Sequence, residues 1–103
     1  MTWVHDALRA LSQKQSCVVR PRGGSMRGRI EDNQRVTIEP VDPTTVNVGD
    51  IVMVRWKGGF LLHLVKAATT TDVQIGNNVG RINGWAPRTD VLGRVTKVHD
   101  DAS

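Results

Sequence analysis

Three separate stretches of the sequence carry residue types that together could perform nucleophilic acyl transfer. Residues 23–26 read Gly-Gly-Ser-Met and present Ser25 in a turn, while residues 61–65 place His63 alone in an apolar strand. Residues 76–80, Gly-Asn-Asn-Val-Gly, form a second tight turn further along the chain. A serine nucleophile, a base and a group that orients the base are the minimum for this chemistry. If the three stretches meet in space, the sequence predicts a serine peptidase.

The candidate nucleophile is Ser25, which follows Gly23 and Gly24 and precedes Met26. Glycine adopts backbone angles closed to other residues and lets another chain approach closely. A nucleophile needs an exposed hydroxyl and backbone N–H groups aimed at the developing oxyanion. Gly23, Gly24 and Met26 are therefore the candidate frame of the oxyanion hole. Alone, these four residues also fit an ordinary Gly-Gly-Ser turn without chemistry.

The candidate general base is His63, which alternates with leucines along its strand. A half-buried position favours the neutral imidazole that can accept a proton. A histidine of this kind also occurs simply as a core residue with satisfied hydrogen bonds. Lys66 is the alternative base, although its place in the strand turns it toward the opposite face. His5 and His99 lie in the terminal helix and tail, which are poor places for a base.

Length and composition place these residues in one small domain. The chain has 103 residues, of which 14 are basic and 10 acidic, giving a net charge of +4. A chain of this length can bury one modest core. The mild positive charge and the scattered tryptophans lack the basic–aromatic pattern of a nucleic-acid surface. We therefore expect a peptide or protein partner rather than nucleic acid, and the oligomeric state stays open.

The cysteine content and the hydropathy indicate the compartment. Cys17 is the only cysteine, so no internal disulfide can form, and it precedes two valines that predict a buried thiol. No run approaches the ~20 apolar residues that a membrane span needs, and the N-terminus lacks a signal-peptide pattern. We expect a cytoplasmic protein without a membrane span. One cysteine and three scattered histidines predict no metal site, and no motif predicts a cofactor.

One helix and six strands are expected to position the candidate residues. Residues 2–15 repeat apolar side chains at helical spacing, with Thr2 as a cap and Asp6 in the first turn. The remainder is rich in Val, Ile and Thr and is divided by turn residues. The predicted strands are 17–20, 35–41, 50–56, 60–66, 72–75 and 91–98. The predicted domain is thus mainly β, with an N-terminal helix (1–16), a coiled mixed sheet or partly open barrel (17–98) and a frayed tail (99–103).

The order of these segments resembles the superfamily that contains signal peptidase I and the LexA-like, self-cleaving repressors. That family has a Gly-x-Ser-Met-x-Pro turn, a Gly-Asp-x-Val-x-Val strand, a strand that carries the base, a Gly-Asp turn and a final Gly-Arg-Val strand. Here residues 23–26, 31–38, 49–54, 62–65 and 92–95 follow this pattern in the same order, with 31–38 as a first strand, and residues 76–77 read Gly-Asn at the place of the Gly-Asp turn. The matching region extends from about residue 17 to residue 98. Histidine in the base position is similar to the endoplasmic-reticulum and archaeal signal peptidases.

The resemblance implies a role for each candidate residue. Ser25 would be the nucleophile and His63 the general base, and the backbone N–H of Ser25 would help to form the oxyanion hole. Asn83 is the nearest candidate for the residue that orients His63, where the histidine-type enzymes use aspartate, and Asp90 is the alternative. An asparagine can accept the imidazole N–H but stabilises an imidazolium less than a carboxylate does. The implied substrate is an extended peptide that pairs with an exposed strand edge.

Three departures from the family pattern support a second hypothesis. Gly28 replaces the family proline, Gly23 replaces a hydroxyl residue that can add an oxyanion donor, and Asn77 replaces aspartate after Gly76. The chain could therefore be a degenerate relative that binds a peptide or protein without cutting it. A small basic nucleic-acid-binding barrel is a more distant third. The peptidase hypothesis predicts about 3–4 Å between Ser25 Oγ and a ring nitrogen of His63.

Overall fold

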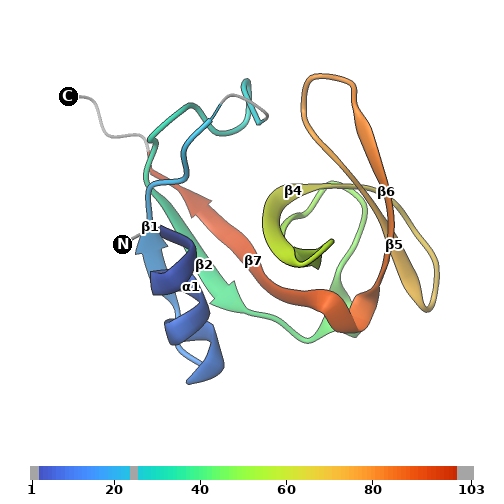
Figure 1. The fold of residues 1–103 in the computed structure, drawn as a ribbon, viewed down its shortest axis with the longest axis horizontal. Helices are drawn as coiled ribbons and strands as arrows, with labels where there is room; N and C mark the ends of the chain where they lie inside the picture. Colours follow the sequence, from blue (N-terminus) through green and yellow to red (C-terminus); the bar gives the residue numbers. More distant parts are fainter. Residues whose placement is uncertain (1–2, 24–25, 100–103) are drawn as a thin grey trace.

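The computed structural model describes residues 3–23 and 26–99 and is mainly β, with one N-terminal helix (Figure 1). Two short 3-10 helices, η1 and η2, interrupt the strands. In chain order the elements are α1 (Trp3–Ser12), β1 (Cys17–Val19), β2 (Val36–Pro40), η1 (Pro43–Thr45), β3 (Ile51–Trp56), β4 (Gly59–Ala68), β5 (Asp72–Gly76), β6 (Ile82–Pro87), η2 (Arg88–Asp90) and β7 (Val91–Val98). No helix within the described ranges is long and apolar enough to cross a bilayer.

The N-terminal helix forms as its apolar spacing predicts, but it ends earlier. Ala7 is fully buried, and the apolar residues around it pack against the same cluster of core side chains. Asp6 in the first turn and Arg9 in the last turn complement the helix dipole. The helix ends at Ser12 rather than near residue 15, and Lys14 has a left-handed φ of 58° that cannot continue it. Thr2, the expected cap, lies outside the described residues.

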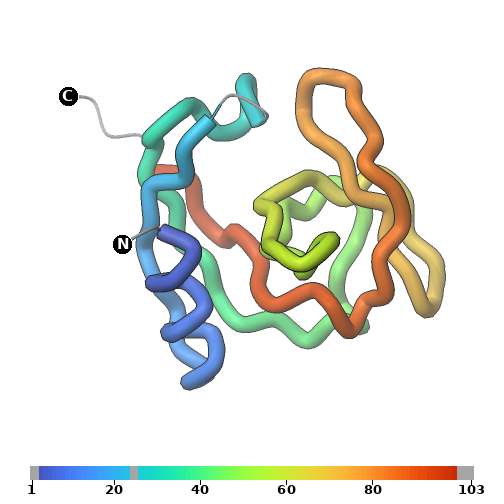
Figure 2. The backbone as a smooth tube through the Cα atoms, in the orientation of Figure 1, coloured from blue at the N-terminus to red at the C-terminus, as the bar shows by residue number. Residues whose placement is uncertain are grey.

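The seven strands form one sheet in the order β1-β2-β7-β3-β4-β5-β6. Every neighbouring pair is antiparallel, so the expectation of a mixed sheet is wrong. β1 and β6 are the edges, and no pairing joins them within residues 3–23 and 26–99, so the sheet stays open. Figure 2 shows the backbone curling around β4, with β7 on one side of it and β5 and β6 on the other.

The sequence pattern does not predict β6, because Gly84 and Pro87 interrupt it. Both residues are tolerated because β6 is an edge strand. Pro87 has no N–H to offer a further strand, a common property of sheet edges. Gly84 has a φ of 147°, and a Cβ there would lie 3.0 Å from a ring carbon of Trp56. This close approach of Trp56 explains the glycine, and the missed strand completes the sheet beside β5.

The central strands contribute side chains to two separate clusters of core residues. Along β3, Ile51 and Met53 belong to the first cluster, whereas Val52 and Val54 belong to the second. Successive residues of a strand point to opposite faces, so the middle of the sheet is buried on both faces. Helix α1 covers the first cluster together with Met26, which comes directly after Ser25. The fold thus anchors the end of the serine turn in the core.

The described part of the C-terminal tail is held in place. The sequence places His99 in a frayed tail, whereas its backbone N–H donates to Arg35 O at 2.8 Å. Its Nε2 lies 2.8 Å from Thr37 Oγ1, and its carbonyl accepts a hydrogen bond from Gln34 Nε2 at 3.1 Å. These bonds tie the end of β7 to β2. Residues 100–103 lie outside the described residues.

Candidate active site

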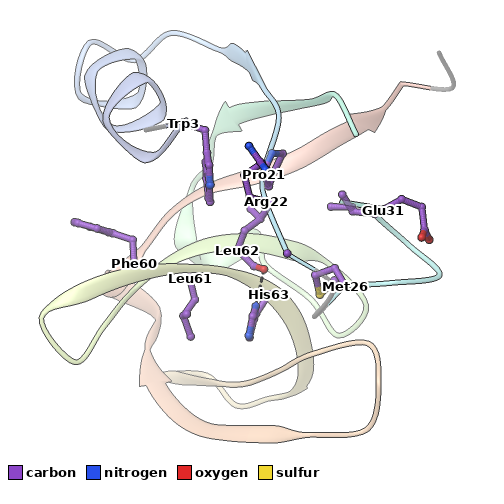
Figure 3. A pocket seen from close by; sticks show the side chains of 11 residues that line it. Trp3, Pro21, Arg22, Met26, Glu31, Phe60, Leu61, Leu62 and His63 are labelled. Atoms are coloured by element: carbon purple, nitrogen blue, oxygen red, sulfur yellow. Dashed lines mark hydrogen bonds between the residues drawn. The ribbon is translucent and has the colours of Figure 1, made fainter. Parts of the chain in front are cut away.

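A cavity of about 200 Å³ brings two of the three candidate stretches together (Figure 3). His63 lines it from β4, and Gly23 and Met26 line it from the serine turn. Its walls come from α1, from the segment between β1 and β2, and from the start of β4: Trp3, Pro21, Arg22, Gly23, Met26, Ile30, Glu31, Phe60, Leu61, Leu62 and His63. Gly24 and Ser25 lie outside the described residues. The predicted distance between Ser25 Oγ and His63 therefore stays a prediction.

The imidazole of His63 is held by a main-chain atom. Only 8% of His63 is exposed, and its Nδ1 lies 2.6 Å from the carbonyl oxygen of Leu62 (Figure 3). A carbonyl oxygen can only accept a hydrogen bond, so Nδ1 carries the proton. In the neutral ring, Nε2 then keeps an unprotonated lone pair. This is the tautomer that a general base acting through Nε2 requires.

The structure does not bring Asn83 to His63. Asn83 lies in β6, two strands away from β4, and its Oδ1 is buried without a hydrogen-bond partner among the described residues. Asp90 lies in η2 before β7, and β3 separates β7 from β4. Leu62 O takes the position at Nδ1 that Asn83 was expected to fill. A backbone acceptor carries no signal in the sequence, so spacing alone could not identify it.

The alternative base, Lys66, lies away from the cavity. It follows His63 by three residues in β4, at a point where the pairing with β5 is irregular. Its aliphatic stem packs beside Gly76, where a Cβ would come 2.9 Å from Lys66 Cε. Lys66 is absent from the residues that line the cavity. Of the two candidate bases, only His63 faces this cavity.

The turn after Ser25 is closed by local hydrogen bonds and anchored by a buried side chain. Met26 is 5% exposed, and its carbonyl accepts from Arg29 N at 3.0 Å and Ile30 N at 2.8 Å. Gly28 N donates to Glu31 Oε2 at 2.8 Å. Gly28 has a φ of 94°, whereas proline is fixed near −65°. Proline therefore cannot occupy position 28 in this turn. The absence of the family proline reflects a different backbone geometry at this position.

The N–H of Gly23 is not free to stabilise an oxyanion. It donates to Asp32 Oδ1 at 2.7 Å, and Asp32 also lies 3.6 Å from Arg22 Nε. Gly23 has a φ of 112°, which a residue with a side chain rarely adopts. Its role is to shape the approach to the turn, and Asp32 holds that shape. The sequence reasoning did not single out Asp32, because its partner is a backbone group nine residues away.

The third stretch contacts the turn that follows Ser25. Asn77 is buried, and its Oδ1 accepts from Val79 N at 3.0 Å and Arg81 N at 2.8 Å. The neighbouring Asn78 reaches out of this loop, and its Nδ2 donates to Arg27 O at 2.8 Å. Asparagine commonly closes loops on its own backbone, as Asn77 does. The distant target of Asn78 could not be read from the sequence.

Four arginines, at positions 20, 22, 27 and 29, surround the serine turn in the sequence, and three of their side chains contact backbone or carboxylate groups of the protein. Arg20 Nη1 donates to Asn33 O at 3.2 Å, and Arg29 Nη2 donates to Gly49 O at 3.1 Å. Arg22 pairs with Asp32, with both side chains largely exposed. These arginines stabilise the loop structure around the cavity. Within the described ranges, no three His, Cys, Asp or Glu side chains gather as metal ligands would.

Comparisons with known proteins found no relative of this chain. No protein-family model matches the sequence, no curated protein matches it, and no solved structure matches the fold.

Proposed function

We propose that the chain is a serine peptidase of the signal peptidase I and LexA-like type, with Ser25 as nucleophile and His63 as general base. One observation carries the proposal. His63 is held with Nδ1 protonated by Leu62 O, and its ring lines a cavity that Gly23 and Met26 share. These two residues flank the pair that includes Ser25 in the sequence. A base in the correct tautomer beside the serine turn is the arrangement that acyl transfer needs.

The proposed chemistry uses the Nε2 lone pair of His63. Nε2 accepts the hydroxyl proton as Ser25 Oγ attacks the carbonyl carbon of the peptide bond. The imidazolium then gives that proton to the leaving amine as the C–N bond breaks. Water attacks the resulting acyl-serine ester through the same relay and releases the acid product. Leu62 O orients the ring throughout but, as a neutral group, stabilises the imidazolium less than a carboxylate would.

The substrate that fits this site is an extended peptide lying along the start of β4. The pairing of β4 with β5 begins at Leu64 opposite Gly76, so residues 59–63 have no strand on that side among the described residues. Val65 N donates to Asp50 O on the β3 side, and amides alternate in direction along a strand. The amides of Phe60 and Leu62 therefore face the open side, where a peptide can add a strand.

The cavity beside this edge suits an apolar side chain of the peptide. Trp3 reaches into it from α1, and Phe60 and Met26 add further apolar surface (Figure 3). Burying an apolar side chain in such a cavity contributes about 1.5–3 kcal/mol. Trp3→Ala should therefore raise KM for an apolar peptide and leave kcat nearly unchanged, because the contact persists equally in ground and transition states.

Labelling with a fluorophosphonate tests the proposal directly. The wild-type protein should gain one adduct at Ser25, located by mass spectrometry of the digested protein. Ser25→Ala should abolish the adduct, and either Ser25→Ala or His63→Gln should lower peptide turnover on the order of 10⁶-fold. Ser16→Ala and His5→Gln, which change an exposed serine and an exposed histidine, should behave like the wild type. An unlabelled wild-type protein would contradict the peptidase proposal.

A second candidate function, peptide binding without cleavage, is favoured by one specific observation. The Gly23 N–H is engaged by Asp32, and position 23 offers no hydroxyl, so the turn has fewer donors for an oxyanion. Losing one such donor lowers kcat by about 10²–10³-fold. In this case a bound peptide would protect the amides of Phe60 and Leu62 from hydrogen exchange and would be recovered intact. Recovery of two peptide fragments would contradict it.

A further inference from the structure

The loop between β5 and β6 makes a direct side-chain contact with the turn that follows Ser25. Asn78 Nδ2 donates to Arg27 O at 2.8 Å across 51 residues of sequence. Arg27 stands two residues after Ser25 in the chain. Among the described residues, this turn is also anchored by the buried Met26 and Ile30 and by the bond from Arg29 to Gly49 O. Gly49 leads to β4 through the bond from its N–H to Val65 O at 2.9 Å, whereas Asn78 joins the turn to the loop after β5.

Asn78 projects from a loop that is itself well braced. Asn77 N donates to Arg81 O at 2.9 Å, and Asn77 Oδ1 accepts two backbone hydrogen bonds. Just before the loop, Gly76 pairs with Leu64, the residue that follows His63. A short path of covalent bonds and hydrogen bonds therefore runs from His63 through Gly76 and Asn78 to Arg27. This path links the strand of the base to the turn of the nucleophile.

Gly28 is shaped to receive the Asn78 amide. A Cβ built on Gly28 would lie 3.0 Å from Asn78 Nδ2, a contact tighter than side chains ordinarily make. The φ of Gly28, 94°, also turns the backbone so that Arg27 presents its carbonyl to the same amide. Any larger residue at position 28 would push Asn78 away. The glycine and the asparagine thus form a matched pair, although 50 positions separate them.

We propose that Asn78 is the positioning residue that fixes the serine turn relative to His63, and this inference rests on the proposed function. Acyl transfer requires the reacting atoms to sit within a narrow range of distance and angle. A displacement of about 1 Å can cost on the order of 10²-fold in rate. Asn78 touches neither the base nor, in this scheme, the substrate. It acts through the backbone of Arg27.

The test compares Asn78→Ala with Asn47→Ala by the kinetics of fluorophosphonate inactivation. Asn47 is a matched control, since its Nδ2 also donates to a loop carbonyl, Thr45 O, at 3.1 Å. Asn78→Ala should lower the maximal inactivation rate about 100-fold with an unchanged half-saturating concentration. Asn78→Asp, which keeps the shape but removes the donor, should behave like Asn78→Ala. Asn47→Ala should match the wild type in both constants.

Two results would overturn the inference while leaving the peptidase proposal intact. One is labelling of Ser25 at the wild-type rate in Asn78→Ala, and the other is a change in the half-saturating concentration alone. A wild-type protein that is never labelled would instead refute the peptidase proposal, and with it the catalytic role proposed for the Asn78 contact.

In that case, hydrogen exchange tests whether the contact itself exists. The amides of Arg29 and Ile30 should exchange faster in Asn78→Ala than in Asn47→Ala, and equal rates would refute the contact too.

Discussion

Hydrogen bonds to backbone groups fix the orientation of the polar side chains at and around the cavity. Leu62 O sets the tautomer of His63, Asp32 occupies the Gly23 amide, and Asn78 holds the Arg27 carbonyl. In each case a polar group is satisfied by a main-chain partner, as most side-chain hydrogen bonds are. The chemistry proposed for His63 therefore depends on strand and turn geometry more than on charged side chains beside it.

The Gly28 and Gly58 positions separate backbone strain from contact with Asn78. Both have left-handed φ angles, 94° and 81°, but a Cβ at Gly58 meets nothing within 4 Å. Gly28→Ala and Gly58→Ala should each lower the free energy of unfolding by about 1–3 kcal/mol through strain. Only Gly28→Ala should also slow the labelling of Ser25, because Gly58 lies in the turn between β3 and β4. Urea titrations and inactivation kinetics on both variants check this, and equal labelling rates would contradict it.

The thiol of Cys17 should be poorly reactive. Burial raises the pKa of Cys17 above its ordinary value, and the nearby negative charge of Asp6 raises it further. Because the thiolate is the reactive form, a raised pKa leaves less of it at pH 8. Iodoacetamide should alkylate the folded protein more slowly than the urea-unfolded protein, and Asp6→Asn should react faster than the wild type. An equal rate for the folded and unfolded protein would refute this prediction.

The strands and turns place the site through the irregularities of the sheet. β4 outruns β5 at its start, which leaves the edge from Gly59 to His63 open beside the cavity. The segment between β1 and β2 closes the other side with Pro21 and Gly23. The peptide proposed as substrate would therefore lie between two backbone segments of this protein, one of which offers alternate amides for pairing.

The short helix η1 predicts a pH dependence of stability. Asp42 caps it, and hydrogen bonds from the Thr44 hydroxyl and then from the Thr44 N–H lower the pKa of Asp42 below its ordinary value of 3.8. A lowered pKa in the folded state means that the carboxylate stabilises the fold above pH 3.8, and that this contribution is lost as the pH falls through the lower folded-state value.

This pH dependence is measurable as a difference in Tm. The difference between wild type and Asp42→Ala should be constant near neutral pH and should shrink as the pH is lowered below 3.8. Thr44→Val removes the hydroxyl that contributes most to the shift, so in that variant the loss should be smaller and should be complete at a higher pH. A difference in Tm that grows on acidification would contradict the sign of the shift.

The sequence predicts the elements that carry regular patterns and misses what depends on contacts across the sheet. Runs of apolar residues bounded by turn residues identify β3 and β4, and helical spacing identifies α1. The relative direction of neighbouring strands leaves no comparable pattern in the sequence, so the expectation of a mixed sheet was wrong. The sequence pattern misses β6 because two of its residues are set by tertiary contacts. Gly84 is required by the close approach of Trp56, and Pro87 is tolerated because β6 is an edge strand. Asn83 was proposed from its place in the family pattern, which does not report that β5 stands between β6 and the strand of His63.

The molecule as a whole is an open antiparallel sheet with a core on each face of its central strands. Met53 of β3 is fully buried in the first cluster, whereas Val48, in the loop before β3, is 61% exposed. Met53→Ala should lower the free energy of unfolding by about 2–5 kcal/mol, because it leaves a cavity in the core under β3. β3 is also the strand that pairs with His63, through Val52.

The matched change at the surface, Val48→Ala, should stay within about 0.5 kcal/mol of the wild type. Urea unfolding with equal m-values would show that both variants keep the same folded state. A small cost for Met53→Ala would mean that the two core clusters do not depend on β3 in the way its burial indicates.

The hydrogen bond from His63 to Leu62 O has a consequence for how this protein can diverge. Every side chain around the ring is open to replacement, but a carbonyl oxygen is present whichever amino acid occupies position 62. Point mutation therefore cannot delete the group that selects the protonated nitrogen. Related chains could lose every recognisable acidic partner of the histidine and still inherit its tautomer, so a motif search for a third catalytic side chain would pass them over.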